Sequence, residues 1–318
     1  MIDILHLHPT RPVIVIGAAF GDLMLEVDQL PTSGTDIEAN EMGQHIGGCA
    51  FNVARALRRL SIPVINGISI GNGKWGQAIE QEMEKEHLSP LLFHPTKDNG
   101  WCIALVDKTK ERTFITVNGC EQVWSPELLA KIPTPDNAII YVSGYELVGT
   151  HAQPLQQWLL SQTNDKTLYL DLGPRINELS SEFLIQLIEK QPILTLNRDE
   201  LAMLMNRIDQ QEGDNVVAAH FFANQHNCQL ICRFDCEGAT VCEPDNIPMT
   251  EPAFQVEVAD TIAAGDSHCA GVIAGLASGL SLVESTRLGN MVAAIVVSKI
   301  GSDGAPTRDE LAIFAQNQ

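Results

Sequence analysis

The 318-residue sequence is poor in positive charge, with 20 Lys and Arg against 40 Asp and Glu and a formal net charge of −20 at pH 7. So acidic a surface repels phosphodiesters and anionic headgroups. We therefore expect no bulk binding to nucleic acid or to a membrane. Any anionic ligand must be held by a local group of donors or positive charges that outweighs the negative electrostatic potential of the whole molecule.

Long apolar runs are also missing, since none reaches the ~18–20 residues of a membrane-spanning helix. Residues 1–11 lack a basic stretch followed by an apolar one, so we expect no secretory signal and a cytoplasmic protein. A reducing cytoplasm suits the eight cysteines, because no two of them form a Cys-x-x-Cys pair.

Four cysteines nevertheless crowd into residues 228–242, which raises the question of a metal site. The apolar run 229–234 predicts a strand, on which residues four apart lie about 13 Å from each other at ~3.3 Å per residue. Cys228 and Cys232 then cannot share one tetrahedral zinc. We expect buried, inert thiols here.

The sequence does contain a regular alternation of strand and helix patterns, interrupted once by a predicted β-hairpin over 101–117. Strands alternating with helices imply right-handed crossovers and a mostly parallel sheet. We expect one α/β domain over 1–318, in which 22–47 has room for further strands beside the hairpin. The main strands are predicted at 13–16, 64–70, 138–142, 167–172, 193–196 and 230–234, and helices at 50–60, 75–87, 264–278 and 282–299.

A glycine motif at 71–76, Gly-Asn-Gly-Lys-Trp-Gly, matches the dinucleotide fingerprint in form. The fingerprint also needs an acid about 20 residues later for the ribose hydroxyls. Residues 93–96 are Phe-His-Pro-Thr, without an acid. A tight turn is the favoured interpretation and an NAD-binding protein the minor alternative. The spacing of a P-loop is absent.

The sharpest local feature is the stretch 259–267, Ala-Asp-Thr-Ile-Ala-Ala-Gly-Asp-Ser. We expect a helix to begin near Ala264, and the unpartnered N–H groups at its N-terminus form an anion site. Asp266 would lie beside a bound phosphate, where a carboxylate can take a proton from an attacking hydroxyl. An N-capping cluster explains the same residues. The residues alone leave these two interpretations open.

Three motifs, taken together and in this order, resemble those of the ribokinase-like (PfkB) carbohydrate kinase family. They are Gly-Gly-Cys-Ala-Phe-Asn-Val-Ala at 47–54, Asn-Arg-Asp-Glu at 197–200 and Asp-Thr-Ile-Ala-Ala-Gly-Asp at 260–266. The similarity extends over about residues 12–315, and an uncharacterised bacterial sugar kinase is the nearest likeness. The resemblance implies a three-layer α/β/α sandwich with a mostly parallel central sheet. A small β-sheet lid would form from about 22–47 and 99–119.

The resemblance also implies an activity, transfer of the γ-phosphoryl group of ATP to a sugar hydroxyl. Asp266 matches the catalytic base of the family. The backbone amides of Ala263, Ala264 and Gly265 match its anion hole. Glu200 matches the residue that organises Mg²⁺ near the phosphates. Activation by K⁺ is left open, with Asp260 as the matching cation ligand.

Further contacts follow from the resemblance on the two sides of the site. The expected sugar contacts are Asp22, Gly47, Gly48, Asn52, Glu146 and Arg175. The expected nucleotide contacts are Asn197, Arg233, Asp235, Gly238, Thr261 and Asn290. Asp235 departs from the family pattern, because many members have a glycine there. His268 replaces the usual aromatic residue, and we expect it to face away from Asp266 because two helix positions correspond to about 200°.

Two other functions compete with a sugar kinase. A nucleoside kinase of the same family, for adenosine, inosine or pseudouridine, is the nearest alternative. A non-catalytic sugar sensor on the same scaffold is less favoured, because Asp266 and the run 263–265 are intact. In relatives the lid closes over the sugar and in several pairs with a second lid, so we expect a homodimer through this sheet.

Overall fold

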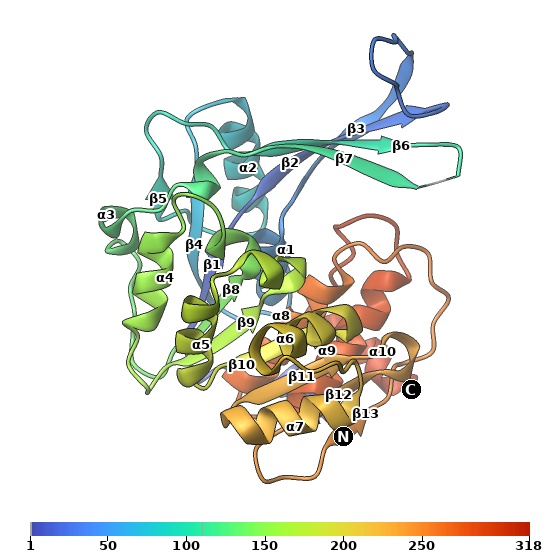
Figure 1. Cartoon of the computed structure of the whole chain (residues 1–318). Coiled ribbons are helices and arrows are strands. Elements are labelled where there is room, and N and C mark those ends of the chain that lie inside the picture. The colour runs from blue at the N-terminus through green and yellow to red at the C-terminus, as the bar shows by residue number, and fades with distance from the viewer. Residues whose placement is uncertain (1, 110) are drawn as a thin grey trace.

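The computed structural model describes residues 2–109 and 111–318, apart from the side chain of Arg112. Its main sheet has nine strands in the order β13-β12-β11-β10-β9-β8-β1-β4-β5 (Figure 1). Neighbouring strands are parallel except at β11–β12 and β12–β13, which confirms the predicted mostly parallel sheet. The strands are β1 (Val13–Gly17), β4 (Val64–Ile70), β5 (Leu92–Phe93), β8 (Ile139–Ser143), β9 (Thr167–Asp171), β10 (Ile193–Asn197), β11 (Gln229–Arg233), β12 (Ala239–Cys242) and β13 (Met249–Glu251).

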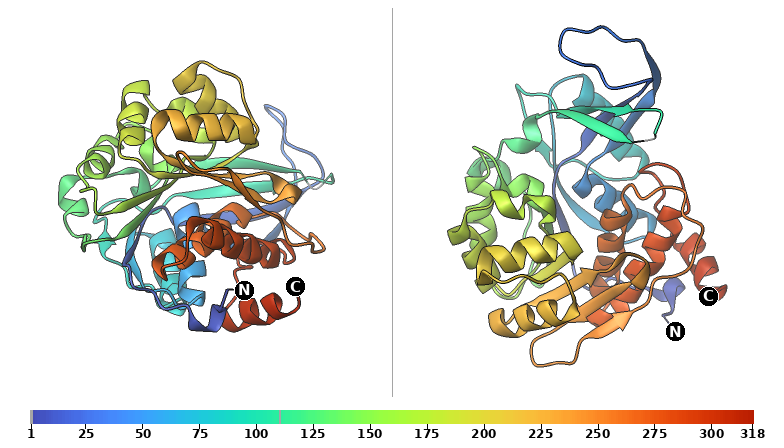
Figure 2. Two further views of the ribbon diagram at one scale, coloured as in Figure 1. Left: turned by 90° about the horizontal axis from the view of Figure 1, so that it is seen from below. Right: turned by 45° about the vertical axis from the view of Figure 1, so that its right-hand side comes forward.

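Helices cover both faces of this sheet and form the predicted three layers (Figure 2). Residues of β1 alternate between the two cores, with Val13 and Val15 in one and Ile14 and Ile16 in the other. The first face carries α1 (Cys49–Arg59), α2 (Lys74–Lys85), α8 (Ala264–Ala277), α9 (Leu282–Val297) and α10 (Arg308–Gln316). The second carries α3 (Pro126–Leu129), α4 (Gln153–Leu160), α5 (Ser181–Glu189), α6 (Arg198–Asp209) and α7 (Val216–His226).

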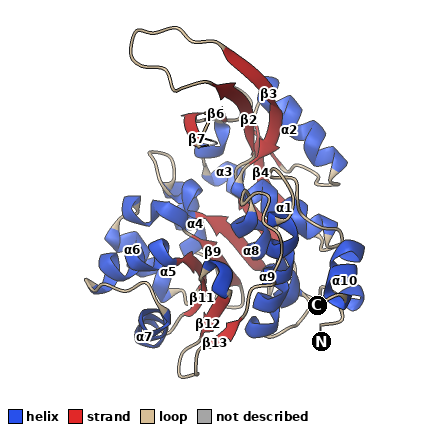
Figure 3. Ribbon diagram, turned by 90° about the vertical axis from the view of Figure 1, so that its right-hand side faces the viewer, coloured by secondary structure: helices blue, strands red, loops and turns tan. Residues whose placement is uncertain are grey.

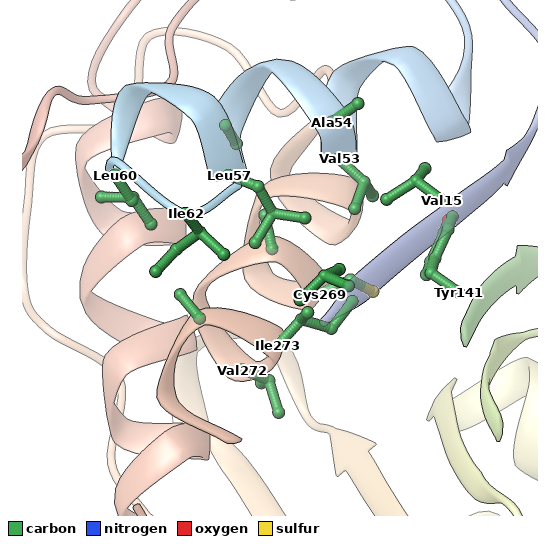
Figure 4. Packing of buried hydrophobic residues seen from close by; sticks show 14 of the residues in the cluster. Val15, Val53, Ala54, Leu57, Leu60, Ile62, Tyr141, Cys269, Val272 and Ile273 are labelled. Carbon is green, nitrogen blue, oxygen red and sulfur yellow. The ribbon is translucent and has the colours of Figure 1, made fainter. Parts of the chain in front are cut away.

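The contact between α1 and α8 fixes the geometry of the site described below. Val53 and Leu57, four residues apart on α1, are fully buried against Ile273 of α8 and Val15 of β1 (Figure 4). Burial of each such side chain contributes about 1.5–3 kcal/mol. The first turns of the two helices are thereby held side by side.

A second, four-stranded sheet projects from the main body, in the order β3-β2-β6-β7 (Figures 1 and 3). Its strands are β2 (Phe20–Val27), β3 (Ala39–Gly47), β6 (Trp101–Val106) and β7 (Arg112–Val117). The predicted hairpin over 101–117 is confirmed as β6 and β7. The region 22–47 supplies the other two strands, as expected, and β2 pairs with β6 in parallel.

Short 3₁₀ helices connect several of these elements. They are η1 (Ile4–His6), η2 (Cys120–Gln122), η3 (Gly144–Leu147), η4 (Gly173–Glu178) and η5 (Asp235–Glu237). Of these, η3, η4 and η5 border the site described below. Within the described chain, no helix combines the length and the apolar character that crossing a bilayer requires.

The crowded cysteines are free thiols. Three of them are buried, and burial raises the pKa of Cys228 to about 12 and that of Cys242 to about 11. Cys236 departs from the expectation of burial, because it lies exposed in η5 at the turn between β11 and β12.

Candidate active site

The carboxyl ends of β9, β10 and β11 meet the N-terminus of α8 at a cavity of about 700 Å³. Such crevices at the carboxyl ends of parallel strands are the usual ligand sites of α/β sheets. Asp171, Asn197 and Arg233, which end these three strands, all line the cavity. Gly265 and Asp266 of α8 line its opposite side.

The N-terminus of α8 presents free backbone donors to this cavity. The amides of Ala263 and Gly265 make no hydrogen bond within the described chain, and that of Ala264 makes only a long one, 3.3 Å, to the carbonyl of Thr261. Ala263 has a left-handed φ of +59°, which turns the chain into the helix. Because unpartnered amides at a helix N-terminus attract anions, they can hold an anionic ligand despite the net negative charge of the chain.

Asp266 lies in the first turn of α8, half-buried at the cavity wall. Its Oδ2 accepts a hydrogen bond from Nδ2 of Asn52 at 2.8 Å. Burial, aided by repulsion from Asp171, raises the pKa of Asp266 to about 6, against the opposing effects of Asn52 and Arg233. A carboxylate with such a pKa is ionised at neutral pH and basic enough to accept a proton.

Arg233 places a guanidinium directly beneath the α8 N-terminus. Its Nη1 lies 3.4 Å from Oδ2 of Asp171 and its Nη2 lies 3.3 Å from Oε2 of Glu200. A Cβ on Gly265 would come within 2.7 Å of Nη1, so the glycine makes room for this cation. Burial lowers the pKa of Arg233, but the acidic groups around it, Asp171 foremost, raise the pKa by more.

The Asn197–Glu200 motif forms a capping box at the start of α6. Oε2 of Glu200 accepts from the Asn197 amide at 2.8 Å, and Oε1 accepts from Nδ2 of Asn197 at 3.0 Å. Burial and the nearby Asp171 raise the pKa of Glu200. The motif therefore orients one carboxylate at the cavity, next to Arg233.

Asp22 lies apart from this cavity, on β2 of the small sheet. Its Oδ1 accepts a hydrogen bond from the thiol of Cys102 at 2.9 Å, and burial raises its pKa. Gly47 lies against it, since a Cβ there would be 2.8 Å from Oδ2. Gly48 precedes α1 and has φ +103°. A Cβ at this position would come within 2.7 Å of the Ala18 carbonyl oxygen, so no larger residue fits. The two glycines thus allow the chain to pass closely between the sheets.

Glu146 and Arg175 already have partners within the chain. Oε1 of Glu146 accepts from the Ala18 amide at 3.0 Å and Oε2 from the hydroxyl of Ser143 at 2.5 Å. Burial raises the pKa of Glu146 to about 7. Arg175 pairs with Glu178 and lies 4.9 Å over the ring of Tyr145, which lines the cavity.

The four remaining nucleotide-side candidates, Asp235, Gly238, Thr261 and Asn290, line the cavity. Asp235 has φ +52°, a left-handed conformation that a glycine would adopt without strain. Asn290 donates to the carbonyls of Glu251 and Pro252 at 2.9 and 3.2 Å. Its Oδ1 lies 3.1 Å from Nε2 of His268, so His268 faces α9 and not Asp266.

Asp260 holds the loop that leads into α8. Its Oδ1 accepts from the amide of Ile262 at 3.2 Å and its Oδ2 from the amide of Gly301 at 3.0 Å. This carboxylate therefore joins the loop before α8 to the loop after α9.

Sequence reasoning missed two residues of the site and one beside it. Asp171 is the last residue of β9, beside β10, and its carboxylate near the end of the strand predicted at 167–172 could have suggested it. Cys49 opens α1 and lines the cavity, and burial raises its pKa well above the ordinary value.

Asp98 accepts from the amides of Trp75 and Gly76 at 3.1 and 2.7 Å. The helix N-terminus of the glycine motif is therefore filled by the chain itself, which removes the basis for a dinucleotide site there.

Comparisons with known proteins identify the family of the chain. The model of the pfkB family of carbohydrate kinases matches residues 11–308. The chain is 39% identical over 307 residues to the uncharacterized sugar kinase YegV of Escherichia coli (strain K12), covering 96% of this chain and 95% of the relative. It is 24% identical over 294 residues to the 5-dehydro-2-deoxygluconokinase of Listeria monocytogenes serotype 4a (strain HCC23), covering 88% and 89%.

Solved structures share the fold at low sequence identity. The ribokinase of Thermotoga maritima superposes with a TM-score of 0.81 at 20% identity, covering 96% of this chain and all of that one. The nucleoside kinase of Methanocaldococcus jannaschii gives a TM-score of 0.80 at 17% identity, covering 98% and 99%.

Proposed function

The chain belongs to the pfkB family of carbohydrate kinases and is a phosphotransferase with an alcohol group as acceptor, and on this premise we propose that Asp266 and the N-terminus of α8 carry out the transfer from ATP to a sugar hydroxyl. The single observation that carries the proposal is a half-buried carboxylate beside unpartnered amides at one wall of the cavity.

Asp266 accepts the proton of the attacking sugar hydroxyl. Its raised pKa, about 6, leaves it ionised at neutral pH. The amides of Ala263, Ala264 and Gly265 stabilise the negative charge that develops on the phosphoryl oxygens. Because phosphoryl transfer needs mainly positioning and charge stabilisation, these two features together supply its principal requirements.

Arg233 and Glu200 support the triphosphate. The guanidinium lies beneath the α8 N-terminus, where a phosphate oxygen can compete with Asp171 for its donors. No group of three or more His, Cys, Asp and Glu side chains in the described part of the chain is arranged to hold a metal. Mg²⁺ commonly takes one or two carboxylates with phosphates and waters, and Glu200 and Asp171 fit that pattern. When bound, Mg²⁺ would neutralise phosphate charge.

K⁺ activation is proposed for the region of Asp260. The Asp260 carboxylate and the carbonyl of Val297 join the loop before α8 to the chain that follows α9. A monovalent cation there would stiffen the loop that carries the anion-binding amides. Replacement of KCl by NaCl should then lower turnover at constant ionic strength.

The sugar binds between Asp266 and the small sheet, which acts as a lid that excludes water from the reaction. Asp22 accepts hydrogen bonds from sugar hydroxyls, and Gly47, Gly48 and Asn52 border the same space. Trp101 lies on the face of the lid opposite Asp22 and Cys102, where it stacks on Trp75 at 6.1 Å between ring centroids. It therefore offers no stacking surface to a base on the Asp22 face, which favours a sugar as substrate, and a nucleoside is the second candidate.

An ADP-release screen tests the proposal, with Mg-ATP and a panel of pentoses, hexoses, keto-sugar acids and nucleosides. We expect ADP release with at least one sugar that depends on Asp266 and on Mg²⁺. Preference for a nucleoside would select the second candidate. Binding of sugars without any ADP release would instead support a sugar sensor and overturn the kinase proposal.

A further inference from the structure

Arg55 is a buried cation on the inner face of α1, where the other buried residues are apolar except Asn52. Its side chain is 2% exposed and is the largest fully buried side chain of the described chain. The guanidinium lies 5.0 Å over the ring of Phe51. Burial of a guanidinium is costly and lowers its pKa. A cation kept in such a place needs an explanation beyond packing.

The contacts of Arg55 lead directly to the proposed base. Its Nη2 donates to Oδ1 of Asn52 at 2.8 Å, and Nδ2 of Asn52 donates to Oδ2 of Asp266 at 2.8 Å. Asn52 is 7% exposed, so water has little access to either end of its amide. With Oδ1 fixed by the guanidinium, the amide can present only its NH₂ group to the carboxylate.

The same guanidinium is anchored to the loop after α9. Nη2 also donates to the carbonyl of Ser302 at 2.8 Å, and Nη1 lies 3.5 Å from Oδ1 of Asp303. The amide of the neighbouring Gly301 binds Asp260, in the loop that leads into the α8 N-terminus. The loop 301–303 therefore contacts both Arg55, which binds Asn52, and Asp260, in the loop before the anion-binding amides.

We propose that Arg55 is a positioning residue, which holds the Asn52 amide in the orientation that keeps Asp266 ionised and correctly aimed. The inference rests on the proposed role of Asp266 as base. Without Arg55, the Asn52 amide can turn by 180° and face Asp266 with its oxygen. The carboxylate then loses a hydrogen bond to its charged form, and its proton affinity increases.

Several other titratable groups face Asp266, and they are unchanged when Arg55 is replaced. They come from every element packed around the carboxylate: Cys49 of α1, Tyr141 of β8, Tyr145 of η3, Asp171 of β9, Arg233 of β11 and Cys269 of α8. None of these is in contact with Arg55 through a hydrogen bond or ion pair in the described chain. A shift in the titration of Asp266 on replacing Arg55 therefore arises either from the Asn52 amide or directly from the lost charge. The same replacement in an Asn52→Ala background isolates the direct part, and an equal shift with and without Asn52 overturns the inference.

Arg55→Met tests the proposal, with Arg55→Lys as the conservative variant. A well-packed apolar side chain often replaces a buried cation without loss of stability, so we expect Arg55→Met to fold. Arg58→Met is the matched control, since Arg58 lies on the same helix and its side chain makes no hydrogen bond or ion pair within the described residues. Two readouts apply: the pH–rate profile with the most active sugar of the panel, and the titration of the Asp266 carboxyl by ¹³C NMR, assigned with Asp266→Asn.

We expect Arg55→Met to move the acidic limb and the Asp266 titration up by about one pH unit, and so to lower kcat about twofold at pH 7 and about tenfold well below pH 6. Arg55→Lys should recover part of both, and Arg58→Met should match the wild type. An unshifted Asp266 titration in a folded Arg55→Met protein overturns the inference. If no panel compound releases ADP from the wild type, the proposed function fails, whereas the NMR titration still decides the role of Arg55.

Discussion

At the scale of single residues, the acids in and around the site differ in burial and in hydrogen bonding, and these differences decide which of them can act on a substrate. Asp266 is half-buried and faces the cavity, whereas Glu146 is 1% exposed and has both oxygens bonded within the chain. The motif around Asp266 could be recognised from the sequence because its residues are contiguous. The role of Arg55 could not, since its partners lie 3 and 247 residues away along the chain.

Glu146 should make stability depend on pH. Its pKa is raised to about 7 in the folded protein from an ordinary value of 4.5. The folded state therefore binds more protons than the unfolded state in this window. The free energy of unfolding should decrease as pH rises from about 4.5 to 7, by up to about 3 kcal/mol from this group.

Glu146→Gln removes this dependence, because the amide does not ionise. Urea unfolding at pH 5 and pH 8 should show a smaller difference between the two pH values for Glu146→Gln than for the wild type. Glu189→Gln, at an exposed position of α5, should keep the wild-type difference. An identical difference in all three proteins would contradict burial as the cause.

At the scale of elements, two helix N-termini looked alike in sequence and differ in the structure. Both α2 and α8 follow a glycine-rich or small-residue stretch. The amides of α2 are bound by Asp98, which lies 22 residues after Gly76, whereas those of α8 face the cavity. Local sequence predicts that a helix begins, but only the tertiary structure decides whether its amides are free. The hairpin and the parallel sheet were predictable because their apolar patterns are local.

Gly265→Ala should damage the α8 N-terminus selectively. The added Cβ would lie 2.7 Å from Nη1 of Arg233 and displace the guanidinium from the cavity floor. We expect the KM for ATP to rise about tenfold, or 1.4 kcal/mol, with a smaller effect on the KM for the sugar.

Ala263→Gly is the companion variant, because it adds no atoms and relieves a left-handed residue with φ +59°. Its affinity for ATP should stay near that of the wild type. Equal KM values for ATP in the Gly265→Ala variant and the wild type would place Arg233 outside the phosphate site.

At the scale of the whole molecule, the small sheet has one face toward the site and one that needs a cover. Side chains alternate along a strand, so Ile103 and Ile115 lie on the face opposite Asp22 and Cys102. Ile115 is 53% exposed, and Val117 on the same face is 44% exposed. This apolar face is the basis for the proposed homodimer through the lid.

Ile115→Lys should convert that dimer into a monomer, because it places a charge on the shared apolar face. Light scattering coupled to size exclusion would measure the mass in solution. Val217→Lys provides the control, since Val217 is 78% exposed on α7, in the main body. Loss of the dimer in the control alone, or a wild type that is already monomeric, would contradict assembly through the lid.

The central claim is that Asp266 removes the proton of the acceptor hydroxyl, and steady-state turnover of Asp266→Asn tests it most directly. Asparagine keeps the shape of the side chain but cannot act as a base. We predict that kcat falls by about 10²–10⁴-fold, while ATP binding by calorimetry stays within a few-fold of the wild type and the exposed control Asp309→Asn is fully active. Turnover of Asp266→Asn within about twofold of the wild type would show that another group serves as the base.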